Sequence, residues 1–253
     1  MEWVIVGLIG LCFGSFVSMA SYRLPREESI IAKRSHCPKC SHKLSFFDLW
    51  PVLSWILSRG KCRHCRVSIS VRYPVTEIVC AGLLLCVYSQ LGLTIHSIVL
   101  MLFSIALLTM LIADLETTLI PDEIHLFLIP LGVMYHWNLG TPASQLIVCV
   151  ILSGGLGLLL HYGYYWVRGF HGLGFGDVKF LFVVGVWLAS ANQLPAYLFA
   201  IGLLGIVIGA VWKFISQEPR FPFAPALAVS LWIMVLWPAS SDLFWGFLRQ
   251  WLI

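Results

Sequence analysis

Long apolar runs separated by short polar breaks make up most of this chain. At roughly 20 residues for each crossing of the hydrocarbon core, the sequence has room for about seven or eight spans. We therefore predict an all-α polytopic membrane protein with about eight transmembrane helices. The expected spans cover residues 4–22, 74–88, 95–113, 124–137 and 145–167, followed by two that share 180–211 and one that starts near 223.

The later spans are interrupted by polar and small residues. Residues 192–195 break the run between spans six and seven, and span six is short enough to need tilt, local thinning or burial in protein. Pro238 interrupts span eight, and the tail to Ile253 is predicted to be an interfacial helix. Small residues recur in spans one, five and seven and are expected to allow close packing: Gly7, Gly10, Gly14, Gly154, Gly157, Gly202, Gly205 and Gly209.

Composition agrees with a membrane protein and excludes a soluble globule. The chain is 59% hydrophobic and 11% charged, whereas a soluble domain averages about 45–50% apolar and about 25% charged residues. Of its 16 Lys and Arg residues, 11 lie between Arg23 and Arg72, against only three acidic residues. This segment of about +8 is expected to be cytoplasmic, with the N-terminus outside.

The other charges are consistent with this topology. Eight crossings place Arg168, Lys179, Lys213 and Arg220 on the cytoplasmic side and only Arg249 on the opposite side. The predicted domains are a first helix (1–22), a cytoplasmic loop domain (23–73) and a multi-helix membrane domain (74–253). The basic clusters lack interleaved aromatic residues for base stacking, so we expect membrane lipid and no nucleic acid as a partner.

Two C-x-x-C pairs in the loop domain predict a structural zinc site. The pairs are separated by 21 residues and supply the four thiolates of a tetrahedral site. A reducing cytoplasm favours metal binding over disulfides, which would be the alternative if the loop lay outside. Three nearby His residues, 36, 42 and 64, are expected to be bystanders. The predicted ligands are Cys37, Cys40, Cys62 and Cys65.

Two acidic motifs at the ends of spans are the candidate catalytic residues. Asp114 follows span three, and Asp177 lies in the sequence Gly174-Phe175-Gly176-Asp177. Two spans separate them, so the chain returns to the same membrane face and the carboxylates are able to meet. Like charges held close push the two pKa values apart, so that one carboxyl group is ionised and the other protonated. The ionised group activates water, and the protonated group donates a hydrogen bond to the peptide carbonyl.

Asp177, Asp122 and Glu77 also have structural interpretations, whereas Asp114 has no obvious capping role because it follows a span. Asp177 could cap the helix that follows it, and an N-cap is the favoured interpretation for Asp122. Glu77 could pair with a basic loop residue or line a ligand pocket, and these alternatives stay open. Glycines before Asp177 would let a substrate backbone approach closely.

With these residues assembled, the chain resembles the type IV prepilin peptidases, also called leader peptidase and N-methyltransferase. The resemblance covers almost the whole chain, because several motifs occur in the family's order. Beside the cysteine pairs, these motifs are Gly14-Ser15-Phe16 with Tyr22-Arg23-Leu24-Pro25, Arg59-Gly60-Lys61-Cys62, Tyr73-Pro74-Val75-Thr76-Glu77, Asp114 through Asp122, Gly174-Phe175-Gly176-Asp177 and Pro222-Phe223-Ala224-Pro225.

The resemblance implies an aspartic endopeptidase with Asp114 and Asp177 as its pair. It would act at the cytoplasmic face of a bacterial inner membrane and cut a short basic leader from type IV prepilins or pseudopilins. It would then N-methylate the new N-terminal residue with S-adenosylmethionine. Substrate or cofactor contacts would include Gly174, Gly176, Glu77, Gly60 and Lys61.

Two positions depart from the family pattern. Ser18 stands where Asn is usual, and Arg66 follows Cys65 where Gly is common. Both lie in the part of the chain that the family links to methylation and the zinc loop, so peptidase activity is the firmer expectation. Two alternatives stay open: a presenilin-like protease that cuts within a substrate's span, and a non-enzymatic membrane scaffold or transporter.

Overall fold

A computed structural model describes residues 1–32, 34–170, 172–216, 221–242 and 244–245. The expectations for Arg220, Arg249 and the tail to Ile253 fall outside these residues. The described residues contain helices and two isolated β-bridges but no strand. The α-helices are α1 (Glu2–Arg23), α2 (Leu53–Leu57), α3 (Arg72–Leu91), α4 (Ile95–Thr117), α5 (Asp122–Asn138), α6 (Ala143–Arg168), α7 (Phe175–Leu188), α8 (Leu194–Ile215) and α9 (Ala224–Leu236), with 3₁₀ turns η1 (Leu24–Arg26) and η2 (Phe46–Leu49).

Five described helices are long and apolar enough to cross a membrane. They are α1 with its 3₁₀ extension, α3, α4, α6 and α8, so the chain is an all-helical, multi-pass membrane protein. In α6 and α8 only 22% of the apolar window is buried within the protein, which leaves most of their side chains to face lipid. Helices α5, α7 and α9 coincide with the other three predicted spans but are shorter.

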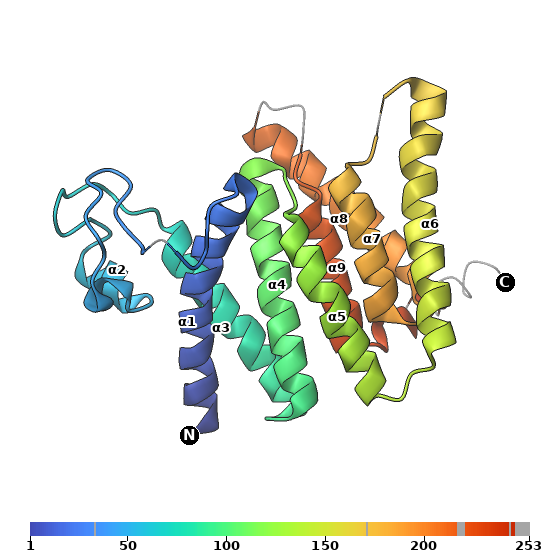
Figure 1. The fold of residues 1–253 in the computed structure, drawn as a ribbon, viewed down its shortest axis with the longest axis horizontal. Coiled ribbons are helices and arrows are strands. Elements are labelled where there is room, and N and C mark those ends of the chain that lie inside the picture. Colours follow the sequence, from blue (N-terminus) through green and yellow to red (C-terminus); the bar gives the residue numbers. More distant parts are fainter. Residues whose placement is uncertain (33, 171, 217–220, 243, 246–253) are drawn as a thin grey trace. The chain divides into compact units, whose positions relative to one another are not determined.

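The chain divides into two compact units, Met1–Thr109 and Met110–Ile253, with the boundary inside α4. In the first unit, α1 and α3 pack as an antiparallel pair (Figure 1). Tyr88 donates a hydrogen bond to Glu2 at one end, and Arg72 donates one to the Ser21 hydroxyl at the other. The helices approach closely because Gly14 has no side chain: a Cβ there would lie 2.4 Å from the Cα of Glu77.

In the second unit, α7 is the central helix. It packs against α5, α6 and α9, and Figure 1 shows it between α5 and α6. Most of its side chains are buried, including the fully buried Phe180 and Val183. Burial in protein therefore explains how a 14-residue apolar helix is stable at this position.

The small residues contribute unequally to this packing. A Cβ on Gly154 in α6 would lie 2.3 Å from the Phe182 ring of α7, so the predicted close approach occurs there. Gly202 in α8 faces open space, because a methyl group added there would have no neighbouring atom within 4 Å, so it forms no helix contact. A pattern of small residues alone does not distinguish a packed helix face from one that faces lipid.

Candidate functional site

Asp114 lies in the last turn of α4 and is only 5% exposed. Its carboxylate oxygen Oδ2 accepts a hydrogen bond of 2.8 Å from the backbone N–H of Ala224, the first residue of α9. The backbone N–H of Phe223 also bonds to this carboxylate. The N-terminus of a helix carries unpaired N–H donors and a partial positive charge, which makes it a good site for an anion. The start of α9 therefore fixes the position of the Asp114 carboxylate.

Asp177 lies in the first turn of α7, three residues after the N-cap residue Gly174. It is only partly buried, and it accepts a hydrogen bond from the backbone N–H of Gly174. This is the return contact of a capping box, so Asp177 stabilises its helix without being the N-cap residue. A Cβ on Gly174 would lie 2.9 Å from Oδ2 of Asp177, so a glycine leaves the carboxylate its space.

The segments that carry the two aspartates meet: Lys179 bonds to Asp122, and a Cβ on Gly176 would lie 3.3 Å from the Cβ of Ile120. The aspartates come from the C-terminal end of α4 and the N-terminal end of α7, and both belong to the second unit. The sequence allows this meeting because an even number of apolar helices, α5 and α6, separates them. One carboxylate is buried and held by backbone donors, whereas the other is partly open to its surroundings. This arrangement suits two carboxyl groups with different protonation states.

The N-cap prediction for Asp122 is wrong. Pro121 is the N-cap residue of α5, and Asp122 is the first helical residue. Both oxygens of Asp122 instead accept hydrogen bonds from Lys179 Nζ, at 2.7 and 2.8 Å. The pair joins the first acidic motif to the second. It is largely exposed, so its contribution to stability is small, about 0–1 kcal/mol.

A buried histidine beside this pair was not identified from the sequence. His125 in α5 is 5% exposed, and its ring packs edge-on against Phe180 at 6.2 Å between centroids. Its Nδ1 lies 3.9 Å from Oδ1 of Asp122, one helical turn earlier. A lone histidine in an apolar run gives no signal that separates a core residue from a site residue.

The four predicted zinc ligands lie together in the first unit. Their Sγ atoms are all within 4.8 Å of one another, and those of Cys37 and Cys65 are 3.8 Å apart. Four sulfurs at about 2.3 Å from a tetrahedral zinc would be about 3.8 Å apart, so the donor set fits this metal. A disulfide would require sulfurs at about 2.0 Å, and all eight cysteines are free. Bonds from the backbone N–H groups of Cys40 and Lys39 lower the pKa of Cys37 to about 6.

The two C-x-x-C turns have the same backbone pattern. In the first, the N–H of Ser41 donates to the carbonyl of Cys37; in the second, Arg66 donates to Cys62 in the same way. Ser41 and Arg66 both have left-handed backbones, with φ of 56° and 58°. This conformation favours glycine, which explains why glycine is common at the position that Arg66 occupies here. The rings of His42 and His64, which the sequence predicts to be bystanders, lie in contact with their planes tilted by 59° and their centroids 3.7 Å apart.

Gly60 and Lys61 have structural contacts in this loop. Gly60 has φ of 65°, and a Cβ there would lie 2.9 Å from the ring of Trp55. Lys61 forms an antiparallel bridge with Ser68, which closes the second cysteine turn. A role for either residue in binding stays a prediction.

Glu77 is buried, 6% exposed, in the second turn of α3. Its Oε2 accepts a 2.7 Å hydrogen bond from the backbone N–H of Val52, and the Ser15 hydroxyl also bonds to it. The carboxylate therefore connects α1, α3 and the loop domain through a backbone donor and a hydroxyl. The basic side chains that the sequence suggested as partners are not among these contacts. A ligand-binding role for Glu77 stays a prediction.

Two known protein families match this chain, one over the region with the cysteine cluster and Glu77 and the other over the region with the two aspartates. Residues 8–91 match the bacterial peptidase A24 N-terminal domain, and residues 101–212 match the type IV leader peptidase family. A prepilin leader peptidase/N-methyltransferase of Pseudomonas putida is 32% identical, over 91% of this chain and 88% of the relative. The chain belongs to the type IV leader peptidase family. No solved structure gives a significant match.

Other members of the type IV leader peptidase family are similarly related. Proteins of the same name from Neisseria gonorrhoeae and Stutzerimonas stutzeri are both 31% identical, over 98% and 91% of this chain and 94% and 89% of the relatives. The region matched to the leader peptidase family includes both aspartates, whereas Ala224 lies beyond its end. Ala224 belongs to the Pro222–Pro225 motif of the family resemblance, but only the structure shows that its backbone N–H bonds to Asp114.

Proposed function

We propose that this protein is a prepilin leader peptidase that also N-methylates the residue it exposes. Its substrates would be type IV prepilins or pseudopilins with a short basic leader. The observation that carries the proposal is the contact between the two acidic motifs, which the bond from Lys179 to Asp122 joins. The names of relatives that span most of this chain support both activities.

In the proposed mechanism the two aspartates have different roles. Asp114 accepts backbone N–H bonds at the start of α9, which favour its charged form, so it would remove a proton from the attacking water. Asp177, which is only partly buried, would carry the proton and donate a hydrogen bond to the scissile carbonyl. As the carbon becomes tetrahedral, Asp177 would pass its proton to the carbonyl oxygen. When the C–N bond breaks, Asp114 would give the proton taken from water to the leaving amine, and a hydroxyl proton of the tetrahedral carbon would return to Asp177, so both carboxyl groups regain their starting states.

The proposal includes zinc as a structural cofactor. The four sulfurs of the cluster have the spacing of a closed tetrahedral site, which leaves no position for a substrate. The metal would supply folding energy to residues 23–73, because a short, polar loop buries little apolar surface. S-adenosylmethionine would be the methyl donor.

The finer topology is also part of this proposal. All eight apolar helices would cross or enter the membrane, with α5, α7 and α9 supported by their neighbours because of their length. The loop domain of residues 23–73 and the ends of α4 and α7 that carry the aspartates would face the cytoplasm. The membrane would be the bacterial inner membrane, where the positive charge of the loop is retained on the cytoplasmic side.

Mass spectrometry of a prepilin incubated with the purified enzyme and S-adenosylmethionine tests the function. We expect the wild type to remove the leader from the prepilin and to add one methyl group to the new N-terminus. The Asp177→Asn variant should not cleave the prepilin, so no N-terminus would be exposed for methylation. Asparagine keeps the size of the side chain but has no proton to give. Normal cleavage by a folded Asp177→Asn variant would contradict the proposed pair.

The same experiment separates the alternatives. A cut inside the substrate's apolar segment would favour the presenilin-like protease over a leader peptidase. If the wild type cleaves no prepilin from several systems, a scaffold or transporter becomes the better explanation. Transport or partner binding that depends on Asp114 would then support that explanation.

A further inference from the structure

An unusual apolar segment lies between the two cysteine pairs, in residues 46–57. Phe46 is 72% exposed, Phe47 66% and Leu57 73%, and the other apolar residues exposed here are Leu49, Trp50, Leu53 and Ile56. The rings of Phe46, Phe47 and Trp50 contact one another, with centroids 6.1 to 6.4 Å apart. A contiguous exposed apolar surface of this kind marks an interaction site. We refer to residues 46–57 as the aromatic segment.

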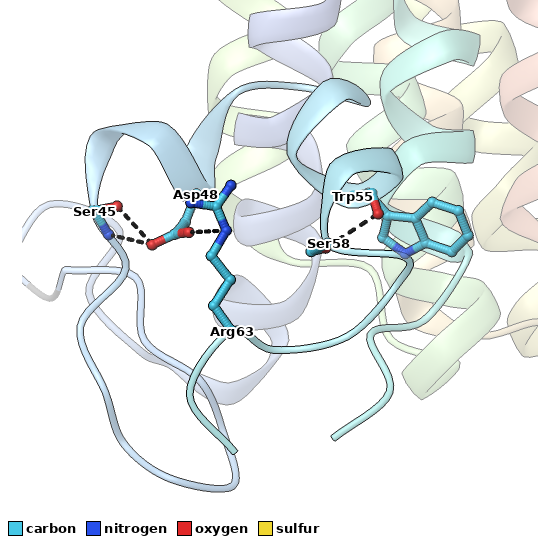
Figure 2. Close-up of polar contacts among 5 residues, drawn as sticks. All are labelled: Ser45, Asp48, Trp55, Ser58 and Arg63. Atoms are coloured by element: carbon cyan, nitrogen blue, oxygen red, sulfur yellow. Dashed lines mark hydrogen bonds and ion pairs between the residues drawn. The ribbon is translucent and has the colours of Figure 1, made fainter. Parts of the chain in front are cut away.

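The polar groups of the aromatic segment are used within the loop domain (Figure 2). Asp48 accepts hydrogen bonds from the backbone and hydroxyl of Ser45 and an ion pair from Arg63 at 3.3 Å. The Ser45 hydroxyl bond is the main reason that the pKa of Asp48 lies below its usual range. Trp55 donates its indole N–H to the carbonyl of Ile69. The large apolar side chains are left as the part of the segment that faces outward.

The aromatic segment is attached beside membrane-spanning helices, well below the end of α1. Its Val52 N–H is bonded to Glu77, and Glu77 packs on Gly14. Gly14 lies nine residues before Arg23, which is about 13 Å along the axis at 1.5 Å per residue. The headgroup layer on one side of a bilayer is only about 5–8 Å thick. An attachment at this depth places the segment at the boundary between headgroups and acyl chains.

The attachment is held by a strained backbone turn. Val52 has φ of 57° and ψ of −50°, and the N–H of Leu53 bonds back to the carbonyl of Pro51. This γ-turn is rare, and a β-branched residue with positive φ costs about 1–3 kcal/mol. The Glu77 carboxylate bonds to the residue at the centre of the turn. A fixed turn between α3 and the start of α2 is what holds the aromatic segment at this depth.

Charge and exposed apolar side chains indicate what the segment contacts. Residues 43–66 carry five Lys and Arg residues and one acidic residue, a net charge of +4 that suits anionic headgroups. Val75, Ile78 and Val79 are also apolar and exposed, and they lie on α3, the helix to which the segment is attached. Aromatic and aliphatic side chains flanked by basic ones are typical of segments that lie in the membrane interface.

We propose that the aromatic segment is a membrane-interface element, with Phe46, Phe47, Trp50 and Leu57 inserted among lipid acyl chains and its basic neighbours at the headgroups. The loop domain is then held at the bilayer in two ways: by its covalent links to α1 and α3, and by the inserted side chains of the aromatic segment. The proposal goes beyond the proteolytic function and does not depend on it. Its partner is the lipid bilayer itself.

Lipid quenching tests the proposal on the full-length protein in nanodiscs of phosphatidylcholine and phosphatidylglycerol. An environment-sensitive fluorescent amino acid replaces Phe47 in one variant and Leu57 in a second. The control position is Ile31, an apolar residue of the same loop domain that is 92% exposed but outside the aromatic segment. The quencher is a lipid with a doxyl group near the headgroup end of its acyl chain. Unchanged thermal melting shows that each variant is folded.

We expect doxyl lipid to quench the label at Phe47 and Leu57 at least about twofold more than at Ile31, because an interfacial segment lies within several ångströms of the upper acyl chain. Equal quenching at all three positions would overturn the proposal. The proposal would also be overturned if doxyl lipid did not quench the label but added prepilin changed its fluorescence, because the surface would then bind peptide. None of these measurements requires catalysis, so a failure of the proposed function leaves the result interpretable.

Discussion

Replacing Gly174 by Ala tests whether the position of the Asp177 carboxylate limits catalysis. The backbone at Gly174 has φ of −62° and ψ of 144°, which any residue adopts, so the change acts through space alone. The new Cβ would lie 2.9 Å from Oδ2, and ordinary contact begins at 3.4 Å. The carboxylate must therefore move by about 0.5 Å. Since a 1 Å displacement of a catalytic group costs about 100-fold in rate, we expect kcat to fall about tenfold.

The assay is the initial rate of leader removal from a purified prepilin at several concentrations. The expected loss is in kcat with little change in KM, because the displaced carboxylate acts on the transition state. The melting temperature should change little, since alanine at an N-cap costs at most about 1 kcal/mol relative to good capping residues. Gly163→Ala is the matched control: it is the same chemical change at a position with open space, and it should keep wild-type kinetics.

A wild-type kcat for Gly174→Ala would refute the reasoning. It would mean that the Asp177 carboxylate takes its catalytic position without regard to the space beside Gly174. A rate loss matched by a large drop in melting temperature would also refute it, because the effect would then be one of folding. An equal loss in Gly163→Ala would show that neither change reports on the site.

Three further changes test the first unit. Gly14→Ala forces a methyl group onto the α3 backbone and should destabilise the protein by about 1–3 kcal/mol, whereas Gly82→Ala, in open space on α3, should not lower the melting temperature. Arg66→Gly removes left-handed strain and should stabilise the cysteine loop by about 1 kcal/mol, seen as slower zinc loss to a chelator; faster loss would contradict the strain. Serine at all four cysteines should abolish bound zinc measured by mass spectrometry and impair methylation more than cleavage; unchanged zinc content would exclude the site.

Much of the helical layout could be predicted because apolar length is a local property of the sequence. All eight expected spans coincide with helices, and the cysteine cluster follows from the spacing of two short motifs. The number of helices that cross the bilayer was harder to predict from the sequence. Whether a helix of 13 to 17 residues spans the membrane depends on its packing against neighbouring helices as well as on its own length.

The contacts of the acidic residues could not be predicted because their partners are distant in sequence. Asp122 looked like a capping residue, but Lys179, 57 positions later, is its partner. For Glu77 the sequence left open a basic partner or a ligand pocket, and in the structure the backbone N–H of Val52 is a donor to it. Side-chain patterns give no sign of such main-chain donors, because every residue except proline carries the same N–H group.

The bond from Ala224 to Asp114 has a consequence for how this enzyme tolerates change. The donor is an amide of the main chain, so replacing the small, fully buried side chain of Ala224 by the hydrogen of glycine would leave the donor in place. Proline is the exception: at the first position of a helix its ring is well accommodated, and the only group lost is the amide hydrogen itself. The reacting carboxylate is thus held by a main-chain group, and proline is the one amino acid that would remove this donor without changing the path of the helix.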